Sequence, residues 1–128
     1  MEGKSLFDPY SSVENFETLY RAVRPWKRFW KKNGKISPAA FKDESGLSID
    51  RDGDRKEQKV IDDFRKRKFE GTLVSVGADK CKEIDIYLKP MPQYWPYHVL
   101  ALNSSTELVL SDEKCDKLRF LIKTVTEL

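Results

Sequence analysis

Three aspartates at every second position, Asp50, Asp52 and Asp54, form the sharpest local motif of the chain. Carboxylates with this spacing open the calcium-binding loop of an EF-hand, which also needs glycine at position 6 and glutamate at position 12. Counted from Asp50, those positions hold Arg55 and Ile61. The motif therefore predicts a polar turn rather than a calcium site, with Asp54 as the cap of the helix that follows.

His98 is the only histidine, which makes it the natural candidate for a general base near neutral pH. If residues 97–102 form a strand, His98 shares a face with Leu100 and Leu102, which favours a partly buried structural role. Cys81 lies between two lysines that favour its thiolate, so a Cys81–His98 nucleophile pair is a further alternative. One histidine and two widely spaced cysteines match no common zinc pattern, and the sequence predicts neither a metal nor a cofactor.

The strongest functional feature is the segment from Arg21 to Lys35, which combines positive charge with aromatic rings and contains no acidic residue. Its cations are Arg21, Arg24, Lys27, Arg28, Lys31, Lys32 and Lys35. Such side chains neutralise phosphates, and the rings of Trp26, Phe29 and Trp30 can stack on unpaired bases. The same rings fall at helical spacing, which is also typical of a core-facing stripe with the cations as a solvated rim. An acidic protein is a third kind of partner for that rim.

A second aromatic cluster, Tyr94, Trp95 and Tyr97, lies in a proline-rich loop. It either covers the edge of the core or extends the binding surface. A second basic run covers residues 65–68. We therefore take the segment from Arg21 to Lys35, together with this loop, as the candidate binding surface.

The elements that position these residues are predicted from hydrophobic periodicity. Residues 71–76 and 97–102 are β-branched or apolar runs typical of strands, and residues 84–90 alternate between apolar and polar. Residues 17–23 end just before a proline and fit either a strand or a helix end. Residues 107–110 either pair briefly or lead on to the next element.

Two helices are predicted with more definite patterns. One spans residues 54–68 with Val60, Ile61 and Phe64 as a narrow apolar stripe. The other begins after Ser111, a good N-cap residue. Its apolar face would consist of Cys115, Leu118, Leu121, Ile122 and Val125.

These patterns predict an α+β fold with a small mixed or antiparallel sheet, at least two helices packed on it and a C-terminal amphipathic helix. Residues 1–12 are predicted to be an N-terminal tail and residues 13–128 a single α+β domain. The chain has 128 residues, the usual size of one domain.

The composition predicts a cytoplasmic protein. No apolar run approaches the roughly 20 residues that span a bilayer, and the first residues lack the apolar stretch of a secretory signal. Two isolated cysteines are typical of a reducing compartment, although one disulfide is also compatible with them. The sequence does not predict the oligomeric state.

Part of the chain resembles a family of small uncharacterised bacterial proteins with an L-Y-R-x-V-x-P, S-x-A-A-F and L-S-[IV]-D signature. The matching residues are Leu19, Tyr20, Arg21, Val23, Pro25, Ser37, Ala39, Ala40, Phe41, Leu47, Ser48 and Asp50, with a weaker match at Pro92 and His98. The resemblance covers about residue 19 to the end and implies no catalytic residue. The lysines and tryptophans between residues 26 and 32 lie outside the signature.

Two functions remain open. The first is a binding or accessory module that engages a protein or nucleic acid through the basic, aromatic surface, in the setting of a toxin or defence operon. The alternative is a small enzyme with a polar pocket formed by Arg21, Ser37, Ser48, Asp50 and His98. The opening L-Y-R and a downstream serine resemble ADP-ribosyltransferase-like domains, which implies that Arg21 holds a nicotinamide dinucleotide. A structural ion pair between Arg21 and Asp50 is the non-catalytic alternative.

Overall fold

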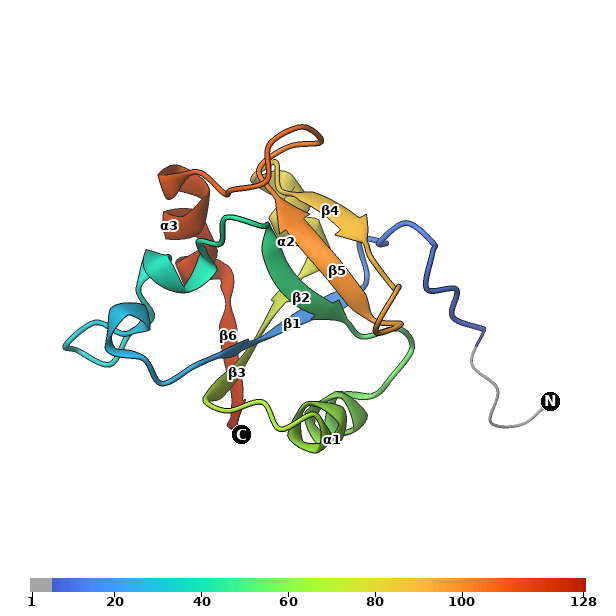
Figure 1. Cartoon of the computed structure of the whole chain (residues 1–128), viewed down its shortest axis with the longest axis horizontal. Helices are drawn as coiled ribbons and strands as arrows, with labels where there is room; N and C mark the ends of the chain where they lie inside the picture. The colour runs from blue at the N-terminus through green and yellow to red at the C-terminus, as the bar shows by residue number, and fades with distance from the viewer. Residues whose placement is uncertain (1–5) are drawn as a thin grey trace.

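The computed structural model describes residues 6–128, which fold around one six-stranded antiparallel sheet (Figure 1). In spatial order the strands are β4 (Tyr87–Pro90), β5 (His98–Leu102), β2 (Leu47–Arg51), β1 (Thr18–Val23), β3 (Thr72–Gly77) and β6 (Lys123–Glu127). Every neighbouring pair is antiparallel. The predicted α+β class is confirmed.

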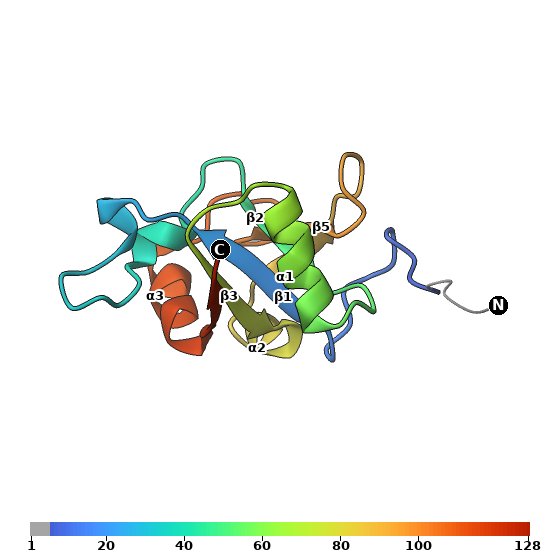
Figure 2. The ribbon, with the colours of Figure 1, turned by 90° about the horizontal axis from the view of Figure 1, so that it is seen from below.

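Helices cover both faces of the sheet. Helix α1 (Glu57–Lys66) packs on one face, and Figure 2 shows it in front of the sheet. The opposite face is covered by α2 (Ala78–Glu83), α3 (Asp112–Leu121) and two short 3-10 turns, η1 (Lys27–Phe29) and η2 (Pro38–Phe41). The larger core lies on this second face.

Strand β1 contributes apolar side chains to the cores on both faces of the sheet. Successive side chains of a strand point to opposite faces. Leu19 and Val23 are buried in the larger core, whereas Tyr20 packs with Phe64 of α1 and Leu73 of β3. The strand is therefore apolar on both sides, which is typical of a central strand and explains why the run at 17–23 lacks a clean alternation.

The segment before β1 is tied to the sheet by a buried ion pair. Arg51, the last residue of β2, is 1% exposed, and its Nη2 donates to Glu17 Oε2 at 2.6 Å. Its Nη1 donates to the carbonyl of Ser11 at 2.7 Å. Val13 is buried in the larger core. Because a buried charge is costly without partners, these bonds fix residues 11–17 against the end of β2.

One predicted strand needs correction, and one helix was missed. The alternation at 84–90 predicted one strand, but α2 ends at Glu83 and the strand begins only at Tyr87. Between them the chain turns at Asp85, which has a φ of 59°. Helix α2 itself was not predicted. Ile86 is buried because this turn places it against the core, although it is not part of a strand. Its apolar side chain was therefore misread as one position of an alternating strand.

The two predicted helices are present but shorter. The Asp52–Arg55 turn has positive φ at Gly53 and Asp54, and Lys56 rather than Asp54 is the N-cap of α1. Ser111 caps α3 as predicted, since its hydroxyl accepts from the N–H of Lys114 at 3.2 Å.

Helix α3 ends at Leu121, and the residues beyond it form β6 instead of a further helical turn. The expected helical face therefore breaks before Val125, which packs against the core under α1. Residues 107–110 form no strand.

Both cysteines, Cys81 and Cys115, are free and buried. Burial raises the pKa of the Cys81 thiol to about 12, and the charge of Asp79 adds to the effect, which contradicts the alternative in which Cys81 is a reactive thiolate. None of the helices within residues 6–128 has the length and apolar character needed to cross a bilayer.

Candidate functional site

A gap between two central strands is the origin of the site. Strands β1 and β2 pair only at Leu19 with Arg51 and at Tyr20 with Asp50, and then diverge. The side chain of Arg21 enters the gap, where its Nε donates to the carbonyl of Ala40 at 3.1 Å and its Nη1 to the carbonyl of Ser48 at 3.0 Å. The guanidinium therefore supplies donors where the strand ladder is interrupted.

Arg21 remains a cation in this position. Burial lowers its pKa to about 10, and the nearby charge of Asp43 acts in the opposite direction. A pKa of about 10 is still well above neutral pH. The gap therefore carries a permanent positive charge in a half-buried place.

A pocket of about 530 Å³ opens over this gap. Its walls come from β1, β2, the start of β5, the η1 turn, the segment just after η2 and the end of α1. The residues that line it are Tyr20, Arg21, Ala22, Arg24, Trp26, Arg28, Phe29, Lys42, Asp43, Ser48, Ile49, Asp50, Phe64, Arg67, Phe69 and His98. We call it the arginine pocket, after Arg21, Arg24, Arg28 and Arg67.

The floor of the arginine pocket is a hydrogen-bonded carboxylate. Asp50 Oδ2 accepts from Trp95 Nε1 at 2.8 Å and from Arg67 Nη1 at 3.1 Å, and Arg55 lies 3.7 Å away. Burial raises the pKa of Asp50, and these three donors offset part of the rise. Asp50 therefore pairs with Arg67 and Arg55, whereas the proposed ion pair with Arg21 is absent from residues 6–128.

A serine and the histidine lie side by side at the rim of the pocket. Strands β2 and β5 are neighbours, which brings His98 Nε2 to 3.1 Å from the exposed Ser48 Oγ. The other ring nitrogen, Nδ1, lies 3.0 Å from the carbonyl oxygen of Met91. Because a carbonyl only accepts, the proton of a neutral ring belongs on Nδ1, and Nε2 accepts from the serine hydroxyl.

Trp26 holds two of the arginines by stacking. The guanidinium groups of Arg24 and Arg28 lie 5.1 and 4.8 Å from the centre of its ring. Trp26 in turn stacks on Phe29 at 5.2 Å. Phe29 is buried and Trp26 is 44% exposed. Within residues 6–128 neither Arg24 nor Arg28 has a carboxylate partner, so both cations face the pocket and the solvent unneutralised.

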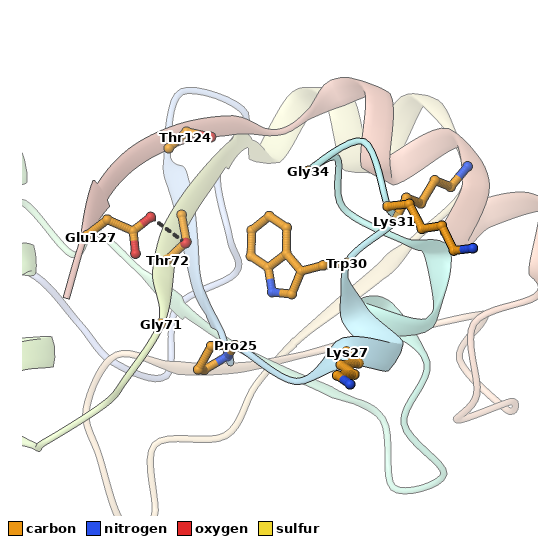
Figure 3. A pocket seen from close by; sticks show the side chains of 10 residues that line it. Pro25, Lys27, Trp30, Lys31, Gly34, Gly71, Thr72, Thr124 and Glu127 are labelled. Carbon is orange, nitrogen blue, oxygen red and sulfur yellow. Dashed lines mark hydrogen bonds between the residues drawn. The ribbon is translucent and has the colours of Figure 1, made fainter.

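Three lysines of the basic segment, Lys27, Lys31 and Lys32, border a different hollow, which Figure 3 shows from close by. We call it the tryptophan groove. It measures about 1120 Å³ and lies between the η1 region and the strands β3 and β6. Its lining residues are Pro25, Lys27, Trp30, Lys31, Lys32, Gly34, Gly71, Thr72, Thr124 and Glu127.

Trp30 stands in the middle of that groove, and its Nε1 donates to the carbonyl of Arg24 at 2.9 Å. The opposite wall is closed by a hydrogen bond from Thr72 to Glu127 at 2.7 Å. In Figure 3 the ammonium group of Lys31 points away from Trp30. The groove is therefore rimmed by solvated lysines instead of fixed guanidinium groups.

The predicted polar set is brought together in part. Arg21, Ser48, Asp50 and His98 all line the arginine pocket. Ser37 does not, because its hydroxyl accepts from the N–H of Ala39 at the start of η2.

The three aromatic residues of the predicted binding loop also lie in different surroundings. Trp95 reaches Asp50 behind the pocket, whereas Tyr97 stacks on Phe7 at 5.5 Å. Tyr94 is fully exposed at the tip of the loop. Lys35 borders a smaller hollow beside Phe120.

Arg67 and Lys42 are pocket residues that the sequence analysis did not assign. Arg67 belongs to the basic run at 65–68, which was noted without a role. Its guanidinium lies 4.2 Å from the ring centre of Trp95, and Lys42 pairs with Asp112. Within residues 6–128 no cluster of three or more His, Cys, Asp or Glu side chains is arranged to hold a metal.

Comparison with known proteins gives no further assignment. A scan against protein-family models, a search of curated proteins and a search of solved structures each found no match.

Proposed function

We propose that this protein is a binding module for single-stranded nucleic acid and that the arginine pocket holds one phosphate of the strand. The observation that carries the proposal is the pair Arg24 and Arg28, two guanidinium groups without a carboxylate partner within residues 6–128, at the mouth of a concave site. Guanidinium groups bind phosphate oxygens through paired N–H donors.

The rest of the pocket supports the same ligand chemistry. Arg21 adds a positive charge that pairs with no carboxylate within residues 6–128, and the pocket volume of about 530 Å³ matches a small-molecule-sized group. Trp26 lies beside the cations and is partly exposed, so an unpaired base next to the bound phosphate has an aromatic surface to contact. A continuous duplex would present no free base to Trp26.

An acidic protein is the competing partner. It would contact the exposed lysines around the tryptophan groove as readily as the arginine pocket, because carboxylates spread over a protein surface are not confined to one pocket. A phosphate ligand, in contrast, depends on the fixed guanidinium groups. The two partners therefore predict different mutational patterns.

The test is a fluorescence anisotropy titration of a labelled single-stranded oligonucleotide with the full chain. We compare Arg24→Glu/Arg28→Glu with Lys31→Glu/Lys32→Glu, two double variants that change the net charge equally. Loss of charge-assisted bonds to phosphate predicts about 100-fold weaker binding for the arginine variant and a much smaller loss for the lysine variant. Circular dichroism verifies that both variants fold.

Salt dependence gives a second readout. For single strands the slope of log affinity against log salt is negative, and its magnitude falls by about 0.7 for each phosphate contact that is lost. Arg24→Ala should lower this magnitude by about that amount, and Lys31→Ala should leave it unchanged. Equal losses for the arginine and lysine variants, or tight binding of a poly-glutamate peptide in place of the oligonucleotide, would contradict the proposal.

A further inference from the structure

Ser48 and His98 have the arrangement of an activated nucleophile and its base. Ser48 Oγ lies 3.1 Å from His98 Nε2, within the hydrogen-bond distance that proton transfer requires. Ser48 is exposed and lines the arginine pocket, so a ligand bound there has access to its hydroxyl.

The imidazole is also held in the orientation that a base needs. The 3.0 Å contact between Nδ1 and the carbonyl of Met91 fixes the ring from its far side and places the proton on Nδ1. His98 begins β5, and its own N–H donates to the carbonyl of Trp95 at 3.0 Å. Nucleophile, base and a third orienting group therefore form one hydrogen-bonded chain, in which a backbone carbonyl is the orienting group.

Positive charge lies next to the serine. Arg21 donates to the backbone carbonyl of Ser48 itself, and Arg24 and Arg28 line the same pocket. Phosphoryl transfer is catalysed mainly by positioning and by cations that stabilise the charge on the non-bridging oxygens. A serine–histidine pair in an arginine-lined pocket therefore suits attack on phosphorus better than attack on a neutral ester.

We propose that Ser48 and His98 cleave a phosphodiester bond of the strand held in the arginine pocket, an inference that rests on the proposed function. Ser48 Oγ attacks phosphorus while His98 Nε2 takes the hydroxyl proton, and the bond from phosphorus to the leaving alkoxide breaks. The His98 imidazolium gives that proton to the alkoxide, which leaves as an alcohol. Ser48 is then esterified to the remaining phosphate group.

Water completes the cycle by attack on the same phosphorus. His98 takes a proton from the water, the Oγ–phosphorus bond breaks, and the proton returns to Ser48 Oγ. The products are one alcohol and one phosphate monoester, and no oxidant or reductant is consumed.

The first experiment traps the nucleophile in the wild-type chain. A fluorophosphonate probe phosphonylates an activated serine, and peptide mass spectrometry locates the adduct. The expected result is one adduct, on Ser48, that is absent from His98→Gln. Ser45, an exposed serine on the loop before β2, is the internal control and should stay unmodified.

The second experiment measures turnover of bis(p-nitrophenyl) phosphate and cleavage of an end-labelled single-stranded oligonucleotide. Loss of nucleophile or base predicts a fall of about 100-fold or more in turnover for Ser48→Ala and for His98→Gln. Ser45→Ala should keep the wild-type rate. Ser45→Ala should also keep the wild-type affinity for the oligonucleotide in the anisotropy titration, because Ser45 does not line the arginine pocket.

The outcomes separate the two proposals. Binding together with Ser48-dependent labelling and turnover supports both. Binding without labelling or turnover overturns the catalytic inference and leaves the binding function standing. Turnover that survives in Ser48→Ala also overturns the catalytic inference. Absence of oligonucleotide binding by the wild-type chain, with no labelling and no turnover, overturns both.

Discussion

The arginine pocket and the tryptophan groove share one stretch of chain, residues 24–34, but offer different surfaces. Around the η1 turn, Arg24 and Arg28 line the pocket, whereas Lys27, Lys31 and Lys32 line the groove. The arginines are stacked against Trp26, and the lysines extend into solvent. Side chains of the same charge sign therefore form two different kinds of surface.

The difference follows from side-chain chemistry. A planar guanidinium lies flat on an aromatic ring and keeps its N–H donors in a fixed direction, whereas a solvated ammonium has no preferred direction. Stacking also limits the conformational entropy that a ligand must remove on binding. Under the proposed function, the pocket binds an anion through these fixed donors, whereas the groove supplies only general electrostatic attraction.

The largest expected effect tests whether the pocket depends on the guanidinium in the gap. Arg21→Met removes a part-buried hydrogen bond to the carbonyl of Ala40 and an exposed one to the carbonyl of Ser48, at a total cost of about 2 kcal/mol in the free energy of unfolding. Lys31→Met, at the groove, is the matched control and should cost less than about 0.5 kcal/mol. Urea denaturation measures both, and equal losses would erase the distinction between the two regions.

A smaller loss is expected at the floor of the pocket. Arg67→Met leaves Asp50 with Trp95 and the more distant Arg55, which predicts a loss of about 1.5 kcal/mol. In the double variant Asp50→Asn/Arg67→Met no charge is left uncompensated, so the two losses should not add. Strictly additive losses in urea denaturation would show that the Asp50–Arg67 contact contributes no interaction energy to folding.

The two tryptophans sharpen the comparison next. Trp30→Phe removes the bond from Nε1 to the carbonyl of Arg24 and should cost about 1 kcal/mol. Trp26→Phe keeps a ring under the arginines and should cost less than about 0.5 kcal/mol, yet weaken oligonucleotide binding because Trp is the better cation–π partner. A reversed order, with Trp26 the more important for folding, would contradict the assignment of Trp26 to the ligand site.

The smallest effect is a pH dependence at Asp50. Burial raises the pKa of this carboxyl, so the folded state binds its proton more tightly than the unfolded state does. By linkage, its contribution to stability declines as the pH rises from roughly 4, the ordinary aspartate value, through the raised pKa. Asp50→Asn lacks this titration, and its stability relative to wild type should improve over that window. The opposite trend would mean that Arg67 and Arg55 outweigh burial.

Much of the fold could be predicted because local signals were strong. Ser111 marks the start of α3, and the stripe of Val60, Ile61 and Phe64 marks α1. Strand β6 was missed because Ile122 and Val125 continue the helical spacing of α3. The β-branched run from Thr124 to Thr126 was the available signal for a strand.

The site was only partly predictable because it depends on long-range pairing. Ser48 meets His98 across the β2–β5 pair, and Arg67 arrives from the end of α1. Ser37 carries the same hydroxyl and lies in the same signature, but its role is to cap a short turn. Pro38 after Ser37 is a local signal for a helical start, but only the sheet topology brings Ser48 to the histidine.

The most direct test of the central claim is a ¹⁵N NMR titration of the full chain with a single-stranded trinucleotide. The indole N–H signals of Trp26 and Trp30 report on the pocket and the groove in one sample, and the Nε–H signals of Arg24 and Arg28 report on the cations. We predict that Trp26, Arg24 and Arg28 shift with saturation while Trp30 stays in place. Saturable shifts at Trp30 with Trp26 and both arginines unmoved would contradict the account.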